Sequence, residues 1–409
     1  MKILLVHNKY QHPGGENVVF ESEGELLAKH GHFVERLLFD NASIRTFMDK
    51  VKLSVNVIYN PSSAKKLSNK IESFAPDIVH VHNFLPLVSP SIFSVAKKYN
   101  IPTILTLHNY RLICPSATLV YKGKIYERSI RSVFPLDAIW KGVYRNSRLQ
   151  TAAVAIMVAV HNIMGTWRNS IDLYIALSHF AKEKFRTSAL AIPEERMVVK
   201  SNFVSDFGVG HLNRDKNFLF VGRLVEEKGI NVLLQAAKIH PFKLTIIGDG
   251  PLRNLVITAT KVNPNIHYLG FQDQNIIAMQ MKKCKALIFP SIWYEGFPLT
   301  ILEAFSTGTP VIASRLGAMA EIIQDRINGL LFEAGNPIAL VEKIKDLDAK
   351  VELAAQLAVH ARSSYLDHYT PEKNYSLLLD IYKKALTQKH RQTLRHLHTV
   401  GSQYHKQQA

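Results

Sequence analysis

Two acidic residues lie around the start of a predicted helix within residues 289–303, whose sequence is FPSIWYEGFPLTILE. Glu295 follows a predicted strand, and Glu303 lies about one and a half turns into the helix. Pro298 suits the first turn of that helix, whose amides would face a phosphate or a sugar. Carboxylates beside those amides would accept hydrogen bonds from hydroxyl groups. The pattern predicts a site for a phosphorylated ligand that carries hydroxyls.

Cationic residues and paired glycines follow other predicted strands. Arg223 and Lys228 lie between the run NFLFVGRL and a helix, where guanidinium and ammonium groups can neutralise a diphosphate. Gly14 and Gly15 follow the first strand, where the backbone can approach a ligand closely. His108 ends the run PTILTLH at the same level. The structural alternatives for these features are a solvated charge cluster, a tight turn and a strand-ending histidine without function.

The elements that position these residues form two series of short β-branched runs, which alternate with stretches of helical periodicity. The first series comprises residues 2–8, 77–83, 102–109, 173–178 and 197–204, and the second comprises 217–224, 243–250, 266–270, 286–291 and 309–314. Such alternation predicts parallel sheets covered by helices on both faces. Residues 205–216 are polar, contain glycine and are typical of a linker. We therefore expect two doubly wound, Rossmann-like α/β domains that face each other across a cleft, with chemistry at the carboxyl ends of the strands.

The net charge of +17 over 409 residues calls for an anionic partner. Nucleic acid, anionic lipid headgroups and small phosphorylated molecules all qualify, and charge alone does not choose among them. We expect no nucleic-acid partner, because the sequence contains no recognition motif and its basic residues are spread over both predicted domains. Hydrophobic residues make up 47% and charged residues 20%, a globular composition.

The cellular setting follows from the cysteines and the apolar segments. Cys114 and Cys284 are far apart and have no metal-ligand spacing, which favours a reducing compartment and a cytoplasmic protein. The apolar stretch 151–167 is short and contains a histidine and an asparagine, so we interpret it as a buried or interfacial helix and not as a membrane span. Residues 121–149 mix basic and aromatic side chains. They predict peripheral contact with an anionic inner membrane surface, with an exposed loop as the alternative.

With these features assembled, the chain resembles glycosyltransferase family 4, the retaining transferases of the two-domain GT-B architecture. The resemblance extends from the first strand to about Leu386. The second half carries VGRLVEEKG, IIGDGP, YLGF, PSIWYEGFPLTILEA, GTPVIAS and NGLLF. The first half carries PGGEN, HNYRLICP and IALSHFAKEKF, which resemble the branch that acts in bacterial surface-polysaccharide assembly.

The resemblance implies roles for the residues singled out above. Glu295 would bind hydroxyls of the donor sugar, Glu303 the nucleotide ribose, and Arg223 with Lys228 the diphosphate. His108 would approach the sugar from the first domain, and backbone around Phe271 would meet the base. The implied catalytic residues are Glu295, His108, Arg223 and Lys228, and the donor-binding residues are Gly14, Gly15, Arg223, Lys228, Gly248, Phe271, Glu295, Gly296, Phe297, Pro298, Leu299 and Glu303.

We expect the chain to comprise five segments. The predicted segments are an acceptor-binding domain over 1–204, a linker over 205–216, a nucleotide-sugar-binding domain over 217–370, a helix over 371–388 that packs back on the first domain, and a frayed basic tail over 389–409. We expect a retaining transfer from a UDP- or GDP-sugar to a glycan or lipid-linked acceptor, in exopolysaccharide, capsule or lipopolysaccharide biosynthesis.

We expect neither a metal nor another cofactor. The string Asp346-Leu347-Asp348 resembles the metal-binding motif of another transferase fold, but it lies in a charged helical stretch and is interpreted as a solvated face. The alternatives are a sugar-nucleotide epimerase of the same fold, a non-catalytic carbohydrate-binding protein and a nucleic-acid-binding protein.

Overall fold

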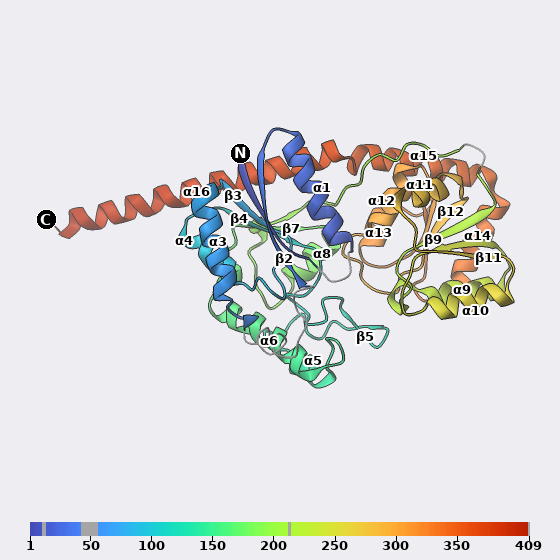
Figure 1. Ribbon diagram of the computed structural model, residues 1–409, viewed down its shortest axis with the longest axis horizontal. Helices are drawn as coiled ribbons and strands as arrows, with labels where there is room; N and C mark the ends of the chain where they lie inside the picture. The colour runs from blue at the N-terminus through green and yellow to red at the C-terminus, as the bar shows by residue number, and fades with distance from the viewer. Residues whose placement is uncertain (10–13, 42–55, 212–213, 408–409) are drawn as a thin grey trace.

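The computed structural model describes residues 1–9, 14–41, 56–211 and 214–407 (Figure 1). Pro13 of the motif PGGEN, residues 212 and 213 of the predicted linker, and residues 408 and 409 of the tail lie outside this part. Two separate parallel sheets of six strands organise the molecule, as the two series of runs predicted.

The first sheet has the strand order β2-β1-β3-β4-β7-β8. Its strands are β1 (Lys2–Lys9), β2 (Phe33–Asp40), β3 (Ile78–Val81), β4 (Thr103–Leu107), β7 (Leu173–Ala176) and β8 (Met197–Val199). Strands β3, β4 and β7 are buried along their whole length, because helices cover both faces of the sheet. The order of the chain reverses between β1 and β3, which makes their carboxyl ends a switch point where ligands bind in such sheets.

The second sheet has the order β11-β10-β9-β12-β13-β14. Its strands are β9 (Asn217–Val221), β10 (Lys243–Ile247), β11 (Ile266–Gly270), β12 (Ala286–Phe289), β13 (Val311–Ser314) and β14 (Leu330–Phe332). This is the Rossmann order, and its switch point lies between β9 and β12. The loops that carry Arg223 and Glu295 leave these two strands.

Helices surround both sheets, and a short hairpin projects from the first domain. The first-domain elements are α1 (Gly15–Lys29), α3 (Pro61–Phe74), α4 (Ser91–Lys98), the hairpin β5 (Val120–Tyr121) and β6 (Lys124–Ile125), α5 (Leu136–Lys141), α6 (Arg148–Ile163), α7 (Thr166–Asn169), α8 (His179–Arg186) and the 3-10 turn η2 (Glu194–Arg196). The second-domain elements are the 3-10 turn η3 (Glu226–Lys228), α9 (Ile230–Ile239), α10 (Arg253–Val262), α11 (Gln274–Lys283), α12 (Leu299–Ser306), α13 (Ala318–Ile322), α14 (Pro337–Ala349) and α15 (Val351–His368).

The last helix, α16 (Pro371–Gln407), returns from the second domain to the first, and its far end projects beyond the body of the molecule (Figure 1). Leu378, Tyr382 and Ala385 are buried against the sheet residues Ile3 and Leu5. The prediction of a frayed tail is wrong for residues 389–407, which continue this helix. The segment contains no proline and many strong helix formers, so the helix propagates past the last packed turn.

Four strands of the described chain were not among the predicted runs, namely β2, β14 and the two short strands of the hairpin β5–β6. β2 is an edge strand with the mixed sequence FVERLLFD and only one buried residue, so its pattern differs from that of a central strand. β14 has three residues and lies at the edge of the second sheet. β2 escapes detection because an edge strand needs no continuous apolar run, whereas β14 and the hairpin strands are too short to show a periodic pattern.

The apolar stretch 151–167 forms most of α6 and then α7. Within the described residues, no helix is both long and apolar enough to cross a bilayer. Asp346 and Asp348 lie in α14, where Asp346 pairs with Arg326 and Asp348 pairs with Lys285. The string Asp-Leu-Asp therefore forms surface ion pairs.

Candidate active site

Glu295 lies in the loop after β12 and is buried. Its Oε1 accepts hydrogen bonds from Ser291 Oγ at 2.7 Å, from Trp293 Nε1 at 2.5 Å and from Lys228 Nζ at 2.7 Å. Three donors on one oxygen hold the carboxylate in a single orientation. No hydrogen bond from a described residue reaches Oε2, which makes that oxygen the one suited to a ligand hydroxyl.

Lys228 and Arg223 supply positive charge at the same switch point. The Lys228 ammonium packs over the rings of Phe289 and Trp293, 5.2 Å and 5.7 Å from their centroids, while it pairs with Glu295. Arg223 is exposed in the loop after β9, and it forms no ion pair with any residue that the structure describes. An exposed guanidinium beside a fixed ammonium is suited to a diphosphate.

Glu303 lies one turn into α12, on a helix whose start carries no side-chain cap. Pro298 stands immediately before α12 and not within its first turn. Burial raises the pKa of the Glu303 carboxyl to about 7, and a hydrogen bond with Gln274 opposes this shift. Gln274 alone does not offset the effect of burial on the carboxylate, and a ligand with paired hydroxyls could provide further donors.

Gly248 and Phe271 lie on the neighbouring strand ends. Gly248 has a φ of 142°, and a Cβ placed on it would lie 1.8 Å from the carbonyl oxygen of Gly222. Glycine is therefore required for the close approach of the loops after β9 and β10, whatever ligand they bind. Phe271 follows β11 and is 80% exposed, so an aromatic face is available at this edge.

The first domain meets these loops directly. The Leu299 side chain, at the start of α12, lies 3.6 Å from the Cβ position of Gly15, which is the first residue of α1, with Gly14 as its cap. A Cβ on Gly296 would lie 2.3 Å from the carbonyl oxygen of His108, so only a glycine permits this contact across the domains. The starts of α1 and α12 and the end of β4 therefore converge on one place.

Further contacts hold the two domains together around this place. Glu321 of α13 accepts hydrogen bonds from the amides of His179 and Phe180 and thereby caps α8 of the other domain. Tyr294 packs on Phe180 at 4.7 Å between ring centroids. A cavity of about 460 Å³ opens beside the loop of Glu295, between Ile292 and the hairpin β5–β6. It is large enough to admit part of a second substrate.

The His108 ring is turned into the first domain. Its Nε2 lies 3.0 Å from Nδ1 of His82, and the two rings stack with centroids 5.2 Å apart. Burial lowers the pKa of His108 to about 3, and the positive charges of His7 and Lys200 add to the effect. His108 is therefore neutral at physiological pH.

The structure brings most of the predicted residues together. Glu295, Gly296, Phe297, Pro298, Leu299, Lys228 and Arg223 gather at one switch point, with Gly14, Gly15 and His108 opposite. Gly248 and Phe271 directly follow the neighbouring strands β10 and β11. Sequence reasoning missed Ser291 and Trp293, which hold Glu295, and His82, which holds His108. The alternation in the run DIVHVHN was the available signal for His82, because it puts two histidines on one strand.

Comparison with known proteins decides the family. An uncharacterized glycosyltransferase of Methanocaldococcus jannaschii is 31% identical over 373 residues, which cover 88% of this chain and 92% of that protein. Family models described as Glycosyltransferase Family 4 and as Glycosyl transferases group 1 match residues 13–206 and 205–364. The chain belongs to glycosyltransferase family 4. The predicted family and enzyme class are thereby confirmed.

Two further proteins resemble this glycosyltransferase, one in sequence and one in structure. The phosphatidyl-myo-inositol mannosyltransferase of Mycobacterium leprae is 30% identical over 235 residues, which cover 55% of this chain and 62% of that protein. The crystal structure of Anabaena HepE in complex with UDP superimposes with a TM-score of 0.66 at 17% identity, and it covers 94% of this chain and all of that one. This likeness confirms the two-domain GT-B fold.

Proposed function

We propose that this glycosyltransferase moves a sugar from a nucleotide-sugar donor to a glycan or lipid-linked acceptor with retention of the anomeric configuration. The observation that carries the proposal is the contact between Gly296 and the His108 carbonyl, which joins the buried Glu295–Lys228 pair to the first domain. A donor bound by the second domain would present its sugar there. The acceptor would approach from the first domain and from the cavity beside Ile292.

The donor would be held by the groups that match its parts. Arg223 and Lys228 would bind the diphosphate, with the amides near Gly15 and Phe297 helping. Glu295 would accept hydrogen bonds from sugar hydroxyls through Oε2, and Glu303 would accept them from the ribose. Phe271 is exposed at the rim, where the backbone would meet the base.

The main contribution to catalysis would be stabilisation of the negative charge on the leaving diphosphate. The described site holds no carboxylate placed as an obvious nucleophile, which favours a front-face, ion-pair-like route in which the departing phosphate oxygen helps to deprotonate the acceptor. Arg223 and Lys228 provide positive charge without a divalent ion, so we propose a metal-independent reaction with no other cofactor. Fixed charges of this kind commonly supply several kcal/mol.

The donor base and the pathway are narrower proposals. The structural relative binds UDP, and the mycobacterial relative is named a mannosyltransferase, so UDP- and GDP-sugars are the first donors to test. The motifs PGGEN and HNYRLICP favour a role in the assembly of exopolysaccharide, capsule or lipopolysaccharide. A lipid-linked acceptor would fit the exposed face of α6.

The exposed face of α6 is an apolar stripe. Leu149, Ile156 and Ile163 are 85%, 40% and 82% exposed, and their spacing of seven residues places them on one side of the helix. Trp140 of the neighbouring α5 is 68% exposed. Arg148 lies over the Trp140 ring at 5.4 Å and adds charge to the stripe. Apolar side chains bordered by arginines suit the interface of an anionic bilayer, so we propose peripheral attachment to the inner face of the cytoplasmic membrane.

Vesicle flotation tests the membrane attachment. The wild-type protein should float with vesicles that contain anionic phospholipid and not with vesicles of neutral phospholipid. The double variant Leu149→Ser/Ile163→Ser should bind at least about tenfold more weakly, because it removes two large apolar side chains from the bilayer. Val262→Ser is the matched control, since Val262 is 79% exposed on the second domain. Equal flotation of both variants would exclude the α6 stripe as the attachment surface.

A donor panel tests the transfer reaction. Purified protein is incubated with labelled UDP-, GDP- and TDP-sugars and a lipid extract from the source cell, and we expect a labelled lipid or glycan from one donor. Glu295→Gln should abolish that product while thermal unfolding shows an intact fold. Wild-type turnover in this variant would contradict the role of Glu295. Interconversion of the nucleotide sugar without an acceptor would indicate an epimerase instead.

A further inference from the structure

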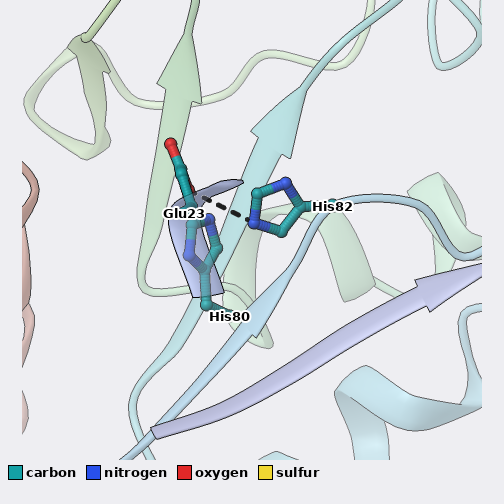
Figure 2. Close-up of side chains that lie close together, drawn as sticks. All are labelled: Glu23, His80 and His82. Atoms are coloured by element: carbon teal, nitrogen blue, oxygen red, sulfur yellow. Dashed lines mark ion pairs between the residues drawn. The ribbon is translucent and has the colours of Figure 1, made fainter. Parts of the chain in front are cut away.

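A buried array of charged and polar side chains continues from His108 into the first domain. His82 Nε2, on the ring that contacts His108, lies 3.4 Å from Glu23 Oε2 of α1 (Figure 2). Glu23 Oε1 accepts a hydrogen bond from the Lys200 ammonium, which also donates to Asn374 of α16 at 3.2 Å. All five side chains are at most 8% exposed. The array thus links the strand end of His108 to the helix that returns from the second domain.

The charges of the array select the tautomer of each histidine. Glu23 Oε2 and His82 Nε2 are buried and neither forms a hydrogen bond with a described residue, so the contact between them at 3.4 Å is electrostatic. A lone pair on His82 Nε2 would repel the carboxylate, whereas an N–H there is attracted to it. Burial lowers the pKa of His82 well below its ordinary value, so the ring is neutral and its Nδ1 carries no proton.

The proton between the two histidines must then come from His108. His82 Nδ1 accepts, and His108 Nε2–H donates, over the distance of 3.0 Å. Since His108 is also neutral, its Nδ1 carries a lone pair, and no hydrogen bond joins that atom to a described residue. Nδ1 is therefore the ring atom of His108 that could accept a hydrogen bond from a ligand.

The same acidic and imidazole groups could be taken for a metal site, because ligand atoms of Glu23, His80 and His82 lie within 4.8 Å of one another. The surroundings oppose this interpretation. Both ring nitrogens of His80 are already hydrogen-bonded, to the hydroxyls of Tyr382 at 2.9 Å and Thr106 at 2.8 Å. The Lys200 ammonium balances the carboxylate and would repel a cation.

We infer that Glu23 and His82 are positioning residues for transfer: they hold His108 as its Nε2–H tautomer, so that Nδ1 accepts a hydrogen bond from a hydroxyl of the donor sugar. The inference rests on the proposed function, because it requires the sugar to lie beside His108. Lys200 makes the array electrically neutral and gives Glu23 a fixed orientation. An imidazole oriented through a buried carboxylate is a general way to set which nitrogen carries the proton.

Glu23→Gln tests the array because it replaces the acceptor that faces His82 with a donor. Lys200 must keep an acceptor, so the amide oxygen of the new side chain would face Lys200 and the amide N–H₂ would face His82. His82 would then carry its proton on Nδ1, and His108 would be left with its proton on Nδ1, where it can no longer accept. We expect kcat to fall about 10- to 100-fold, the range found when a buried orienting partner is lost. The affinity for the nucleotide product should not change, because neither Glu23 nor His82 is among the residues proposed to bind it.

Tyr382→Phe is the matched control. It removes a buried hydrogen bond to His80 at 2.9 Å, in the same cluster, without altering the contacts from His108 to Lys200. This variant should keep the wild-type kcat. A fall as large as that of Glu23→Gln would mean that the cluster acts only through general packing, and it would overturn the inference.

Nitrogen NMR of histidine-labelled protein reads the tautomers without any activity. Signals of His82 and His108 are assigned by their loss in His82→Asn and His108→Asn, and both residues should carry the proton on Nε2 in the wild-type protein. A proton on His108 Nδ1, or a folded Glu23→Gln protein with wild-type kcat, would refute the inference. This measurement decides the array even if Glu23→Gln does not fold. Absence of transfer by the wild-type protein with every donor would instead refute the proposed function and leave the tautomer result standing.

Discussion

The proposed contact between Glu303 and the donor ribose should make donor binding depend on pH. The pKa of its carboxyl is about 7 because of burial. Ribose hydroxyls would donate to the ionised form and lower that pKa in the complex. Binding then releases a proton near neutral pH, and affinity rises with pH until the free carboxyl is fully ionised. At about pH 6 roughly one-tenth of the carboxyls are ionised, so we expect about tenfold weaker binding than at about pH 8.

The assay is calorimetric titration with an intact nucleotide-sugar, whose phosphates do not titrate in this range. Measurements near pH 6.5 in buffers of different ionisation enthalpy should show release of a proton on binding. Glu303→Gln should bind weakly and with an affinity that no longer changes with pH. Equal wild-type affinity at both ends of the range, or the same pH dependence in the variant, would refute the role of Glu303.

In the absence of donor, ionisation of the Glu303 carboxyl lowers the free energy of unfolding. An ordinary glutamate pKa is 4.5, so the folded chain binds more protons at Glu303 than the unfolded chain does. The resulting penalty is absent below about pH 4.5, grows as pH rises, and reaches about 3 kcal/mol above about pH 7. Glu303→Gln should therefore raise the melting temperature at about pH 8 and leave it unchanged at about pH 4. No gain at the higher pH would contradict the raised pKa.

Three further predictions concern the loops of the site. Arg223→Ala should raise the activation free energy by about 3 kcal/mol and so lower kcat roughly 100-fold, as steady-state kinetics would show. Thermal unfolding should show little change in stability. Gly296→Ala should abolish transfer by pushing the loop away from the His108 carbonyl, and solution scattering should detect a more open molecule; unchanged scattering and activity would contradict the contact. Gly248→Ala should destabilise the second domain by at least about 1 to 3 kcal/mol, measured by chemical denaturation, because its φ is 142° and its Cβ would meet the Gly222 carbonyl.

Much of the second domain follows from its sequence. Strands β9, β10, β12 and β13 are mainly apolar and almost wholly buried, and Arg223, Lys228 and Glu295 follow β9 and β12. The carboxyl ends of parallel strands lie on one edge, so sequence position alone indicates that such residues share a site. The role of each remains a prediction, but their proximity could be expected.

The first domain is less predictable, because its features depend on contacts between distant segments. His82 directly follows β3 and Glu23 lies in α1, and nothing in either segment shows that they meet. The apolar residues of 151–167 suggest burial, yet Ile156 and Ile163 are exposed, because helix propensity does not determine which side of α6 packs against the rest of the domain. The edge strand β2 lacks a buried run for a similar reason.

The sequence by itself determined the parallel α/β architecture, the division near residues 205–216 and the placement of Glu295 and Glu303 around the start of a helix, because these depend on local periodicity and on residues that follow strands. Only the tertiary structure decided that Gly296 meets the His108 carbonyl, that Glu295 is held by Lys228, and that the His108 ring turns inward to His82. These contacts depend on how two domains and a returning helix pack. Packing of distant surfaces is set by the summed burial of many side chains, which no local pattern encodes.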